Sequence, residues 1–548
     1  MLFESEVRKV LEKSGIKDIR LEVPPDSKMG DLAFACFKLG GNPVEKAREL
    51  AKKIKPSGMI GKIIAVGPYV NFFVEFEKFS GLILKEAQKK SFGGNFLDGT
   101  ALIEHTSINP NASPHVGRAR NAIISDSVVR ILRFAGYKVD VHYFVNDIGK
   151  QIAMLVYATK ELKGKPKFDE MIKHYIEINR RVLENVTLEK DVLNLLYRLE
   201  KGDKKIRKMF EDVVSICIKG QTSILGELNI KYDSFDYESK YIGSKILKDV
   251  LKKLKPKTKK DFEGRLVLDL SEFNLPMKEP FVPLTRNDGT SLYFLRDIAY
   301  NVDKIRWSKG GKNIVALGED HKLEFMQIKS ALSLMKLPAP EVIHYTFILL
   351  PEGKMSTRSG TVVLLTDFMK EAVDKAREEI TKRNPRIKDE TLERTAKAIG
   401  HSAIKYAFLK VSPEKNIIFN WEDALNLEGN SAPYLQYTAV RAKKILEKVD
   451  AVKPKKLKFE DAFEMKLIKK ISDFTAVIKE CAEQYKPHVL ANYAFELATV
   501  FNEFYEKCSV MNETDLDKKG SRILLVTAYL NVISNCLNLL GLWIPEFM

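Results

Sequence analysis

Two short polar segments of this chain carry side chains that could bind the phosphates of a nucleotide. The first is residues 114–118, PHVGR, between a predicted strand and a predicted helix. His115 and Arg118 can donate hydrogen bonds to phosphate oxygens, and Gly117 has no Cβ, so a ligand can approach its backbone. A helix beginning here also offers free N–H groups and its positive dipole end. The segment therefore predicts a phosphate site, although for His115 alone a hydrogen bond within its own turn is the alternative.

The second segment is residues 354–360, KMSTRSG, on a predicted loop. Lys354 and Arg358 could fold over a triphosphate and neutralise the charge that develops as pyrophosphate leaves. A basic surface loop is the alternative, since lysine is abundant throughout the chain. Two such segments in this order and structural context rarely arise by chance, so we expect both to serve one nucleotide site.

Length, composition and cysteine content limit the classes of protein to which this chain can belong. A chain of 548 residues with 45% hydrophobic and 30% charged residues is globular and predicts roughly three or four domains. The five cysteines form no CxxC pair, which disfavours a zinc knuckle and fits a reducing, cytoplasmic compartment. No apolar run approaches about 18 residues, so we expect no membrane partner.

The net charge of +17 indicates either a polyanionic partner or a lysine-rich surface, and charge alone does not separate the two. The densest basic stretch is residues 252–260, KKLKPKTKK. It is interpreted either as a phosphate-contacting loop or as a solvated linker.

The predicted elements position these segments in an α/β domain. Residues 1–92 predict a small α+β domain, with helices at 2–14 and after Asn42 and a strand at 69–76. Residues 98–410 predict a Rossmann-like domain with a parallel sheet, interrupted by a helix-like insertion at about 160–262. Its strands are expected at 101–107, 139–145, 313–317 and 342–349, and its helices at 118–134 and 321–335.

Residues 411–548 predict an all-α bundle, because strand-like sequence nearly vanishes after about residue 400. Its main helices are expected at 464–484, 487–508 and 521–540.

The two polar segments resemble the HIGH and KMSKS signatures of class I aminoacyl-tRNA synthetases. Two positions depart from the usual pattern: Arg118 stands where a second histidine is common, and Thr357 replaces the second lysine. Arginine retains phosphate binding, bidentately and with a fixed charge.

Longer stretches are similar to arginyl-tRNA synthetases of the archaeal type, over essentially the whole chain. Besides the MSTR loop, they are residues 30–33, 67–71, 104–110, 146–151, 288–297, 428–437 and 545–548. This resemblance implies that residues 1–92 are an additional tRNA-binding domain and that residues 411–548 are an anticodon-binding domain.

The resemblance also implies which residues contact ATP and act in catalysis. The catalytic residues would be His115, Arg118, Lys354 and Arg358. The ATP-binding residues would be Pro114, His115, Gly117, Arg118, Gly318, Asp320, Lys354, Met355 and Ser356.

For the amino acid, recognition of guanidinium requires a carboxylate and further acceptors in its plane. Tyr293 and Asp297 are four residues apart and would share a helix face, although a surface pair would show the same spacing. By resemblance, Asp297 would receive the guanidinium and Tyr293 its second edge. The other arginine-binding residues expected are Asn109, Asn146 and His321.

For the tRNA, Tyr434, Tyr437 and Arg441 would share a helix face on which unpaired bases can stack. The alternative is that the tyrosines are core residues. Tyr505 and Met548 are further candidates for the same pocket.

The resemblance implies an arginine–tRNA ligase. It would activate arginine with Mg-ATP to arginyl-adenylate and pass the arginyl group to the 3′ end of tRNA(Arg), with tRNA needed for the first step. We expect no tightly bound cofactor, no metal site, Mg²⁺ only with the substrate ATP, and a monomer. The alternatives are another class I synthetase or nucleotidyltransferase, and a catalytically weak tRNA-binding paralogue.

Overall fold

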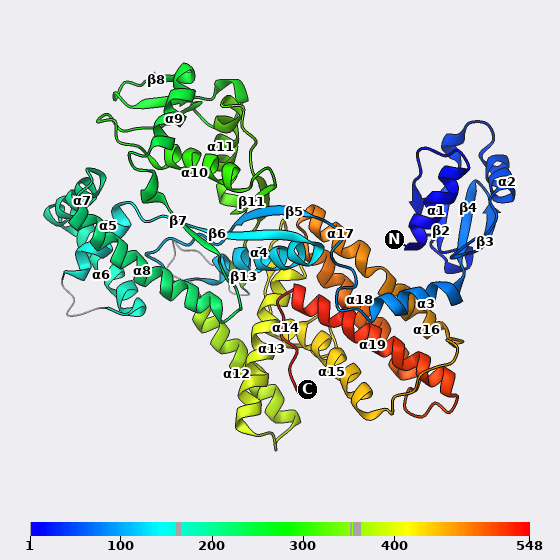
Figure 1. Cartoon of the computed structure of the whole chain (residues 1–548). Helices are drawn as coiled ribbons and strands as arrows, with labels where there is room; N and C mark the ends of the chain where they lie inside the picture. Colours follow the sequence, from blue (N-terminus) through cyan, green and yellow to red (C-terminus); the bar gives the residue numbers. More distant parts are fainter. Residues whose placement is uncertain (1, 161–165, 351–352, 355–362) are drawn as a thin grey trace. The chain divides into compact units, whose positions relative to one another are not determined.

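The computed structural model describes residues 2–160, 166–350, 353–354 and 363–548, which form two compact units (Figure 1). The first comprises Met1–Gly94, Leu435–Lys479 and Tyr493–Cys536, and the second comprises Asn95–Tyr434, Glu480–Asn492 and Leu537–Met548. Each unit is therefore assembled from segments that are far apart in the sequence.

The second unit contains a five-stranded parallel sheet of order β12-β11-β5-β6-β7. Its strands are β5 (Gly99–Glu104), β6 (Tyr137–Val145), β7 (Ser234–Tyr237), β11 (Lys312–Gly318) and β12 (Glu341–Tyr345). The central strand β5 is continuously buried over its last four residues, as expected for a strand covered on both faces. The chain turns from β5 into α4 (Val116–Ala135), which packs against β6 and β11. The expected Rossmann-like α/β fold is confirmed.

One strand of this sheet was missed by the sequence analysis. β7 lies inside the region read as a helical insertion and extends the sheet beyond β6, where Tyr143 is opposite Phe235. Its residues SFDY alternate polar and aromatic side chains and are mostly half-buried, as at the edge of a sheet. The insertion proper consists of α6 (Phe168–Glu184), α7 (Val186–Glu200) and α8 (Lys204–Gly226). These helices share a hydrophobic core with α5 (Lys150–Thr159).

A second correction concerns the single strand expected at 342–349. It is two strands, because the chain leaves the main sheet after β12 and forms β13 (Ile348–Leu350). β13 pairs with β14 (Gly353–Lys354) and β15 (Ile417–Ile418) in a separate small sheet. The break falls at Thr346, whose N–H donates to the carbonyl of Pro413 instead of to a neighbouring strand.

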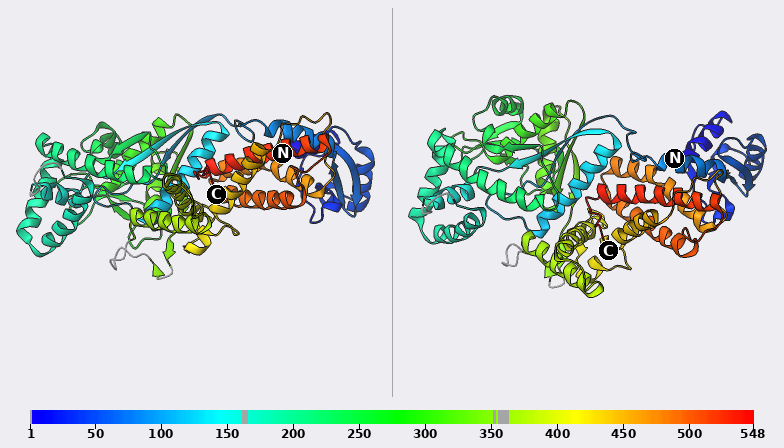
Figure 2. Two further views of the ribbon diagram at one scale, coloured as in Figure 1. Left: turned by 90° about the horizontal axis from the view of Figure 1, so that it is seen from below. Right: turned by 60° about the horizontal axis from the view of Figure 1, so that its bottom comes forward.

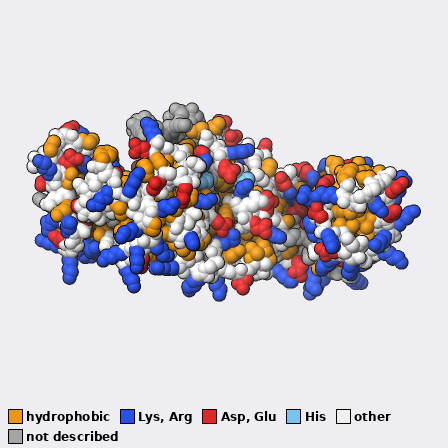
Figure 3. Space-filling view, turned by 90° about the horizontal axis from the view of Figure 1, so that it is seen from above, with side chains coloured by type: hydrophobic (Ala, Val, Ile, Leu, Met, Phe, Trp, Pro, Cys, Tyr) orange, Lys and Arg blue, Asp and Glu red, His pale blue; other side chains and the backbone are white. Residues whose placement is uncertain are grey.

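The lysine-rich stretch 252–260 is neither a loop nor a linker. It covers the end of α9 (Lys245–Leu254), a short turn and β8 (Thr258–Lys260). β8 belongs to an antiparallel sheet with β9 (Leu266–Asp269) and β10 (Phe281–Pro283), and its lysines are exposed. Figure 3 shows how widely such basic side chains are spread over one face, with acidic ones between them.

The remaining helices of the second unit include α12 and α13, which pack against α4. These remaining helices are α10 (Tyr293–Trp307), α11 (Lys322–Leu334), α12 (Leu365–Arg383), α13 (Asp389–Leu409) and α14 (Trp421–Leu425). α12 and α13 pack along each other, as the yellow-green ribbons of Figure 2 show.

The first unit joins the N-terminal domain to helices from the C-terminal part of the chain. An antiparallel sheet of order β1-β2-β4-β3 carries α1 and α2, and α3 follows it. The bounds are α1 (Leu2–Lys13), β1 (Leu21–Glu22), β2 (Leu32–Ala35), α2 (Pro43–Lys53), β3 (Ile60–Val66), β4 (Tyr69–Val74) and α3 (Phe76–Ala87). Asn42 caps α2 by accepting from the N–H of Val44, with Pro43 in the first turn.

The C-terminal helices form the expected bundle. They are α15 (Ala432–Lys448), α16 (Ala462–Ser472), α17 (Phe474–Gln484), α18 (Pro487–Lys507) and α19 (Leu516–Leu539). The one helix expected at 464–484 is two, because the backbone tightens at Asp473 into hydrogen bonds between residues three apart. Among the described helices, α19 is long and apolar enough to cross a membrane, but 56% of its most apolar window is buried, as in the core helix of a globular protein.

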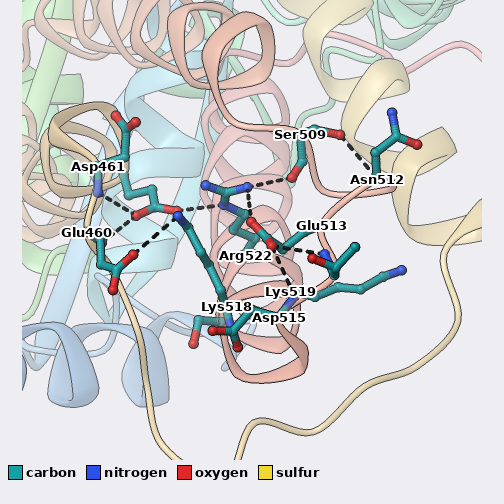
Figure 4. A network of polar contacts seen from close by, with 12 residues as sticks. Glu460, Asp461, Ser509, Asn512, Glu513, Asp515, Lys518, Lys519 and Arg522 are labelled. Atoms are coloured by element: carbon teal, nitrogen blue, oxygen red, sulfur yellow. Dashed lines mark hydrogen bonds and ion pairs between the residues drawn. The ribbon is translucent and has the colours of Figure 1, made fainter.

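Buried charges fix the loop between α18 and α19 (Figure 4). Arg522 donates to the carboxylates of Glu464 and Glu513 and to the carbonyl of Ser509. Glu464 is fully buried and also accepts from the N–H groups of Glu460 and Asp461. Its charge is thus satisfied on several sides, as a buried ion requires.

Candidate active site and RNA-binding residues

The carboxyl ends of the parallel strands bring four polar positions to one edge of the sheet. His105 follows β5, Asn146 follows β6, Glu238 follows β7 and Glu319 follows β11. In open α/β sheets this edge is where ligands bind, next to the helix that follows the central strand. The phosphate site predicted around residue 115 lies there.

His115 directly precedes α4, and the segment at residues 363–365 clamps it. Val116 donates its N–H to the carbonyl of Val363, and Leu365 donates to the carbonyl of Pro114. A Cβ on Gly117 would lie 3.2 Å from the His115 ring, so a small residue lets the imidazole lie over the first turn. Burial, assisted by the charge of Arg118, lowers the pKa of His115 to about 4. His115 is therefore neutral at pH 7 and acts as a hydrogen-bonding group.

The loop before His115 is held in a strained backbone conformation. Thr106 and Ser107 have φ angles of 72° and 44°, a region that costs residues with a Cβ about 1 kcal/mol or more each. Asn121 of α4 compensates by accepting from the N–H of Thr106 at 2.8 Å and donating to the carbonyl of Ala316 at 2.9 Å. The loop is thereby tied to both α4 and β11.

Arg120, one turn further into α4, is fully buried and was missed by the sequence analysis. It donates to the carbonyls of Thr346 and Lys415 at 2.8 Å and of Ser412 at 3.1 Å. Burial lowers the pKa of Arg120 to about 10, so the guanidinium stays charged at neutral pH. It connects α4 to the residues that precede β13 and to those that precede β15.

Helix α10 presents Tyr293 and Asp297 in an acidic environment. Tyr293 is exposed and Asp297 is half-buried. Two ion pairs surround them: Arg296 with Glu238, and Lys304 with Glu104. Neither partner glutamate was predicted; Glu238 follows the missed strand β7, and recognition of that strand would have placed it at the ligand edge.

The carboxylate of Asp297 makes no hydrogen bond or ion pair with any described residue. Burial raises its pKa well above the usual 3.8, and the charges of Glu238 and Glu104 raise it further. Arg296 and Lys304 act in the opposite sense without cancelling the shift. Among the described residues, Asp297 is thus a carboxyl group without a cation of its own, beside two carboxylates that are each paired with one.

Asn109 and Asn146 line one pocket of about 180 Å³ together with residues 148–152. The Asn146 amide, oriented by its neighbours, donates to the carbonyl of Ile148 at 2.9 Å and to Glu238 Oε2 at 2.8 Å. Both of its N–H groups are then used, so its oxygen remains as an acceptor. Glu238 therefore bonds to Asn146 as well as to Arg296, beside Asp297.

Gly318 ends β11, and a Cβ there would lie 2.4 Å from Asp320 Oδ1, so a larger residue would displace the Asp320 side chain. Asp320 is exposed. His321 hydrogen-bonds Glu324 at 2.6 Å, which raises the pKa of the imidazole. Glu324 in turn is close enough to help raise the pKa of Tyr293, a shift caused mainly by burial. Glu324 thus interacts electrostatically with Tyr293 and forms a hydrogen bond with His321.

The second signature is only partly described. Lys354 is in β14 opposite Leu349, and nothing further is described for its side chain. Met355, Ser356 and Arg358 lie outside the described residues. Within the described ranges, no three His, Cys, Asp or Glu side chains are grouped so that they could hold a metal ion.

Three of the predicted RNA-binding residues meet on the surface of the first unit. The guanidinium carbon of Arg441 lies 4.5 Å from the ring centroid of Tyr437 and 4.4 Å from that of Tyr505. Arg441 also donates to the Tyr437 hydroxyl at 2.7 Å and to Asn502 Oδ1 at 2.8 Å. We call Tyr437, Arg441 and Tyr505 the aromatic stack; α15 supplies the first two and α18 the third.

Of the other two candidates, Tyr434 lies three residues before Tyr437 in α15. Tyr434 is half-buried at the start of α15, in the segment assigned to the second unit. Met548 packs against Ala376, Ala396 and Ile399 of α12 and α13.

Comparison with known proteins matches this arrangement along the whole chain. The family model "tRNA synthetases class I (R), catalytic domain" matches residues 84–421. The "DALR anticodon binding domain" matches residues 435–548, and the "Arginyl tRNA synthetase N terminal domain" matches residues 2–74.

Curated relatives and solved structures agree with these matches. Arginine–tRNA ligases of Methanocaldococcus jannaschii and Methanothermobacter thermautotrophicus are each 38% identical, covering 99% and 98% of this chain and 98% and 97% of their own lengths. The Thermus thermophilus arginyl-tRNA synthetase structure superposes with a TM-score of 0.85 at 26% identity, covering 100% of this chain and 99% of that one.

Proposed function

This chain belongs to the arginyl-tRNA synthetases, the class I ligases that join arginine to tRNA at the expense of ATP, and we propose which of its residues do so. Asp297 receives the guanidinium of arginine and Tyr293 borders its edge. Asn109 and Asn146 contact the amino and carboxylate groups of the substrate, and His321 adjoins this site.

The observation that carries this proposal is that Asp297 has no cationic partner among the described residues. A half-buried carboxyl group beside two carboxylates that are already ion-paired, Glu238 and Glu104, favours binding of a cation. Guanidinium is always charged and supplies several donors in one plane. Lysine would bring the same charge but only a compact ammonium, which cannot reach several acceptors in a plane.

For the first step, we propose that Pro114, His115, Gly117 and Arg118 bind the phosphates of Mg-ATP at the start of α4. Gly318 and Asp320 would contact its ribose, and Lys354, Met355, Ser356 and Arg358 would close over the pyrophosphate. The carboxylate of arginine attacks the α-phosphate, forming the bond to AMP as the bond to pyrophosphate breaks. His115 is neutral, so its contribution is a hydrogen bond, whereas Arg118, Lys354 and Arg358 supply the charge.

For the second step, the arginyl group passes from AMP to the 3′ end of tRNA(Arg). The aromatic stack, with Tyr434 and Met548 as further contacts, would bind anticodon bases. We propose domains at 1–92, 98–410 and 411–548, a monomer in the cytoplasm, and a first step that requires bound tRNA.

ATP–pyrophosphate exchange with each of the twenty amino acids, with and without tRNA, tests the proposal. Arginine should be the only strong substrate, and tRNA should raise its rate sharply. Equal exchange with lysine would contradict the assignment of Asp297 and Tyr293. Exchange with arginine at full rate without tRNA would contradict the tRNA requirement alone.

A further inference from the structure

One buried side chain of the helical insertion reaches the loop that precedes the phosphate site. Gln221 lies in α8 and is fully buried. Its Nε2 donates to the carbonyls of Asn109 at 2.9 Å and Ala112 at 2.7 Å. Its Oε1 lies 2.9 Å from the Tyr143 hydroxyl of β6. Both N–H groups and the oxygen of this amide are therefore engaged.

Tyr143 holds the same loop at Ile108, one residue before Asn109. Its hydroxyl, also fully buried, accepts from the N–H of Ile108 at 3.0 Å and lies 3.1 Å from the carbonyl of that residue. The backbone from Ile108 to Ala112 thus depends on two polar side chains that have no access to water. Buried polar groups left without such partners destabilise the conformation that they occupy.

The loop held in this way carries Asn109, which was assigned above to the amino and carboxylate groups of the substrate. Asn109 is exposed and lines the pocket shared with Asn146. Its backbone carbonyl is one of the two that Gln221 binds. A displacement of the loop would therefore move the Asn109 side chain relative to the pocket, and the effect of a side chain on binding is sensitive to shifts of about 1 Å.

We infer that Gln221 is a positioning residue for the amino-acid substrate: it fixes residues 108–112 so that Asn109 points into the pocket. The inference rests on the proposed function of Asn109. It assigns the helical insertion a role in the affinity for arginine, although its helices α6–α8 lie outside the nucleotide-binding sheet.

Gln221→Leu tests this, because leucine keeps the approximate size and removes all three polar contacts. In ATP–pyrophosphate exchange with saturating tRNA, the KM for arginine should rise roughly ten-fold or more, and by clearly more than the KM for ATP. Gln221→Met also keeps the approximate length and removes both donors and the acceptor, so it should show the same split if the leucine variant folds poorly.

Thr222→Val is the matched control on the next residue. Among the described residues, the Thr222 hydroxyl bonds within its own helix, to the carbonyls of Ile218 and Lys219. Its KM for arginine should stay within about two-fold of wild type. A purely structural role for Gln221 would instead lower the melting temperature and leave the KM for arginine unchanged, which would overturn the inference.

A double mutant shows whether Gln221 acts through Asn109. In an Asn109→Ala background, Gln221→Leu should change the KM for arginine by less than about two-fold, since the group that it positions is gone. The same large rise in both backgrounds would overturn the inference. Asp297→Asn separates this failure from a failure of the proposed site: if it raises the KM for arginine and Gln221→Leu does not, only the role of Gln221 is wrong.

Discussion

The surroundings of Asp297 and the aromatic stack are built in opposite ways for the ligands that we propose for them. Around Asp297, charges are withdrawn from water, and Glu238 and Glu104, which pair with Arg296 and Lys304 of α10, come from distant parts of the chain. In the stack, one cation lies between two rings, and Tyr505 keeps 42% of its surface exposed. Buried charge discriminates by the cost of leaving it unpaired, whereas exposed rings bind any flat base with modest energy.

This difference predicts how each region responds to substitution. Loss of a buried charge partner should affect one substrate strongly, because the remaining charges stay desolvated. Loss of a ring should affect tRNA moderately, because solvent replaces part of the contact.

The largest effect is expected for Asp297→Asn, which keeps the shape and removes the charge. The guanidinium then loses a desolvated partner worth on the order of 2–5 kcal/mol, so the KM for arginine should rise at least about thirty-fold. The KM for ATP should change little. Asp303→Asn is the matched control: it is a buried carboxylate on the same helix, bonded to the Tyr241 hydroxyl. An unchanged KM for arginine in Asp297→Asn would show that Asp297 does not pair with the guanidinium.

A smaller effect is expected for Tyr437→Ala. A stacked base contributes about 1–3 kcal/mol, so the KM for tRNA should rise roughly ten-fold while the melting temperature stays close to wild type. Tyr529→Ala is the comparison, since this tyrosine of α19 is fully buried against Phe501 and its loss should cost about 3–5 kcal/mol of stability. A large loss of stability in Tyr437→Ala with normal tRNA binding would make Tyr437 a core residue.

The pH dependence should be smaller again and confined to the buried region. Because the pKa of Asp297 is raised above 3.8, a larger fraction is protonated in mild acid, and only the ionised form pairs with guanidinium. The KM for arginine should therefore fall several-fold as pH rises through the raised pKa. The same shift makes folding of the free enzyme less favourable as pH rises through this window, since the native state then binds more protons than the unfolded state. KM measured at a series of pH values should be flat in Asp297→Asn.

The smallest effect is expected for Arg441→Lys. Lysine keeps the charge but cannot bond Tyr437 and Asn502 while lying flat against two rings. The KM for tRNA should rise a few-fold, with no change in the KM for arginine. A loss as large as that of Tyr437→Ala would show that Arg441, rather than the rings, carries the binding.

Local spacing predicted the stack better than it predicted the acidic site. Tyr437 and Arg441 are neighbours four apart on one helix, so periodicity alone brings them together, and resemblance added Tyr505. Tyr293 and Asp297 were found by the same spacing. Their electrostatic surroundings were not predicted, because Glu104 and Glu238 are brought close to α10 by the order of the strands in the sheet, which local spacing does not reveal.

The fold was predictable wherever burial leaves a clear periodicity. α4 and β6 were expected within two residues of their bounds. β7 was missed because a short edge strand with half-buried residues has no such signal. Gln221 could not be found either, since a glutamine in an amphipathic helix is ordinarily a solvated residue.

The path of the chain between the two units has a consequence for synthesis on the ribosome. The sequence passes from one unit to the other five times, and Leu537–Met548 belongs to the catalytic unit that begins at Asn95. In that unit, Ser127 of α4 donates to the carbonyl of Leu539. The nascent catalytic unit therefore lacks this contact until some four hundred further residues have been synthesised. Until then the unit is incompletely folded, and chaperones can bind such a state.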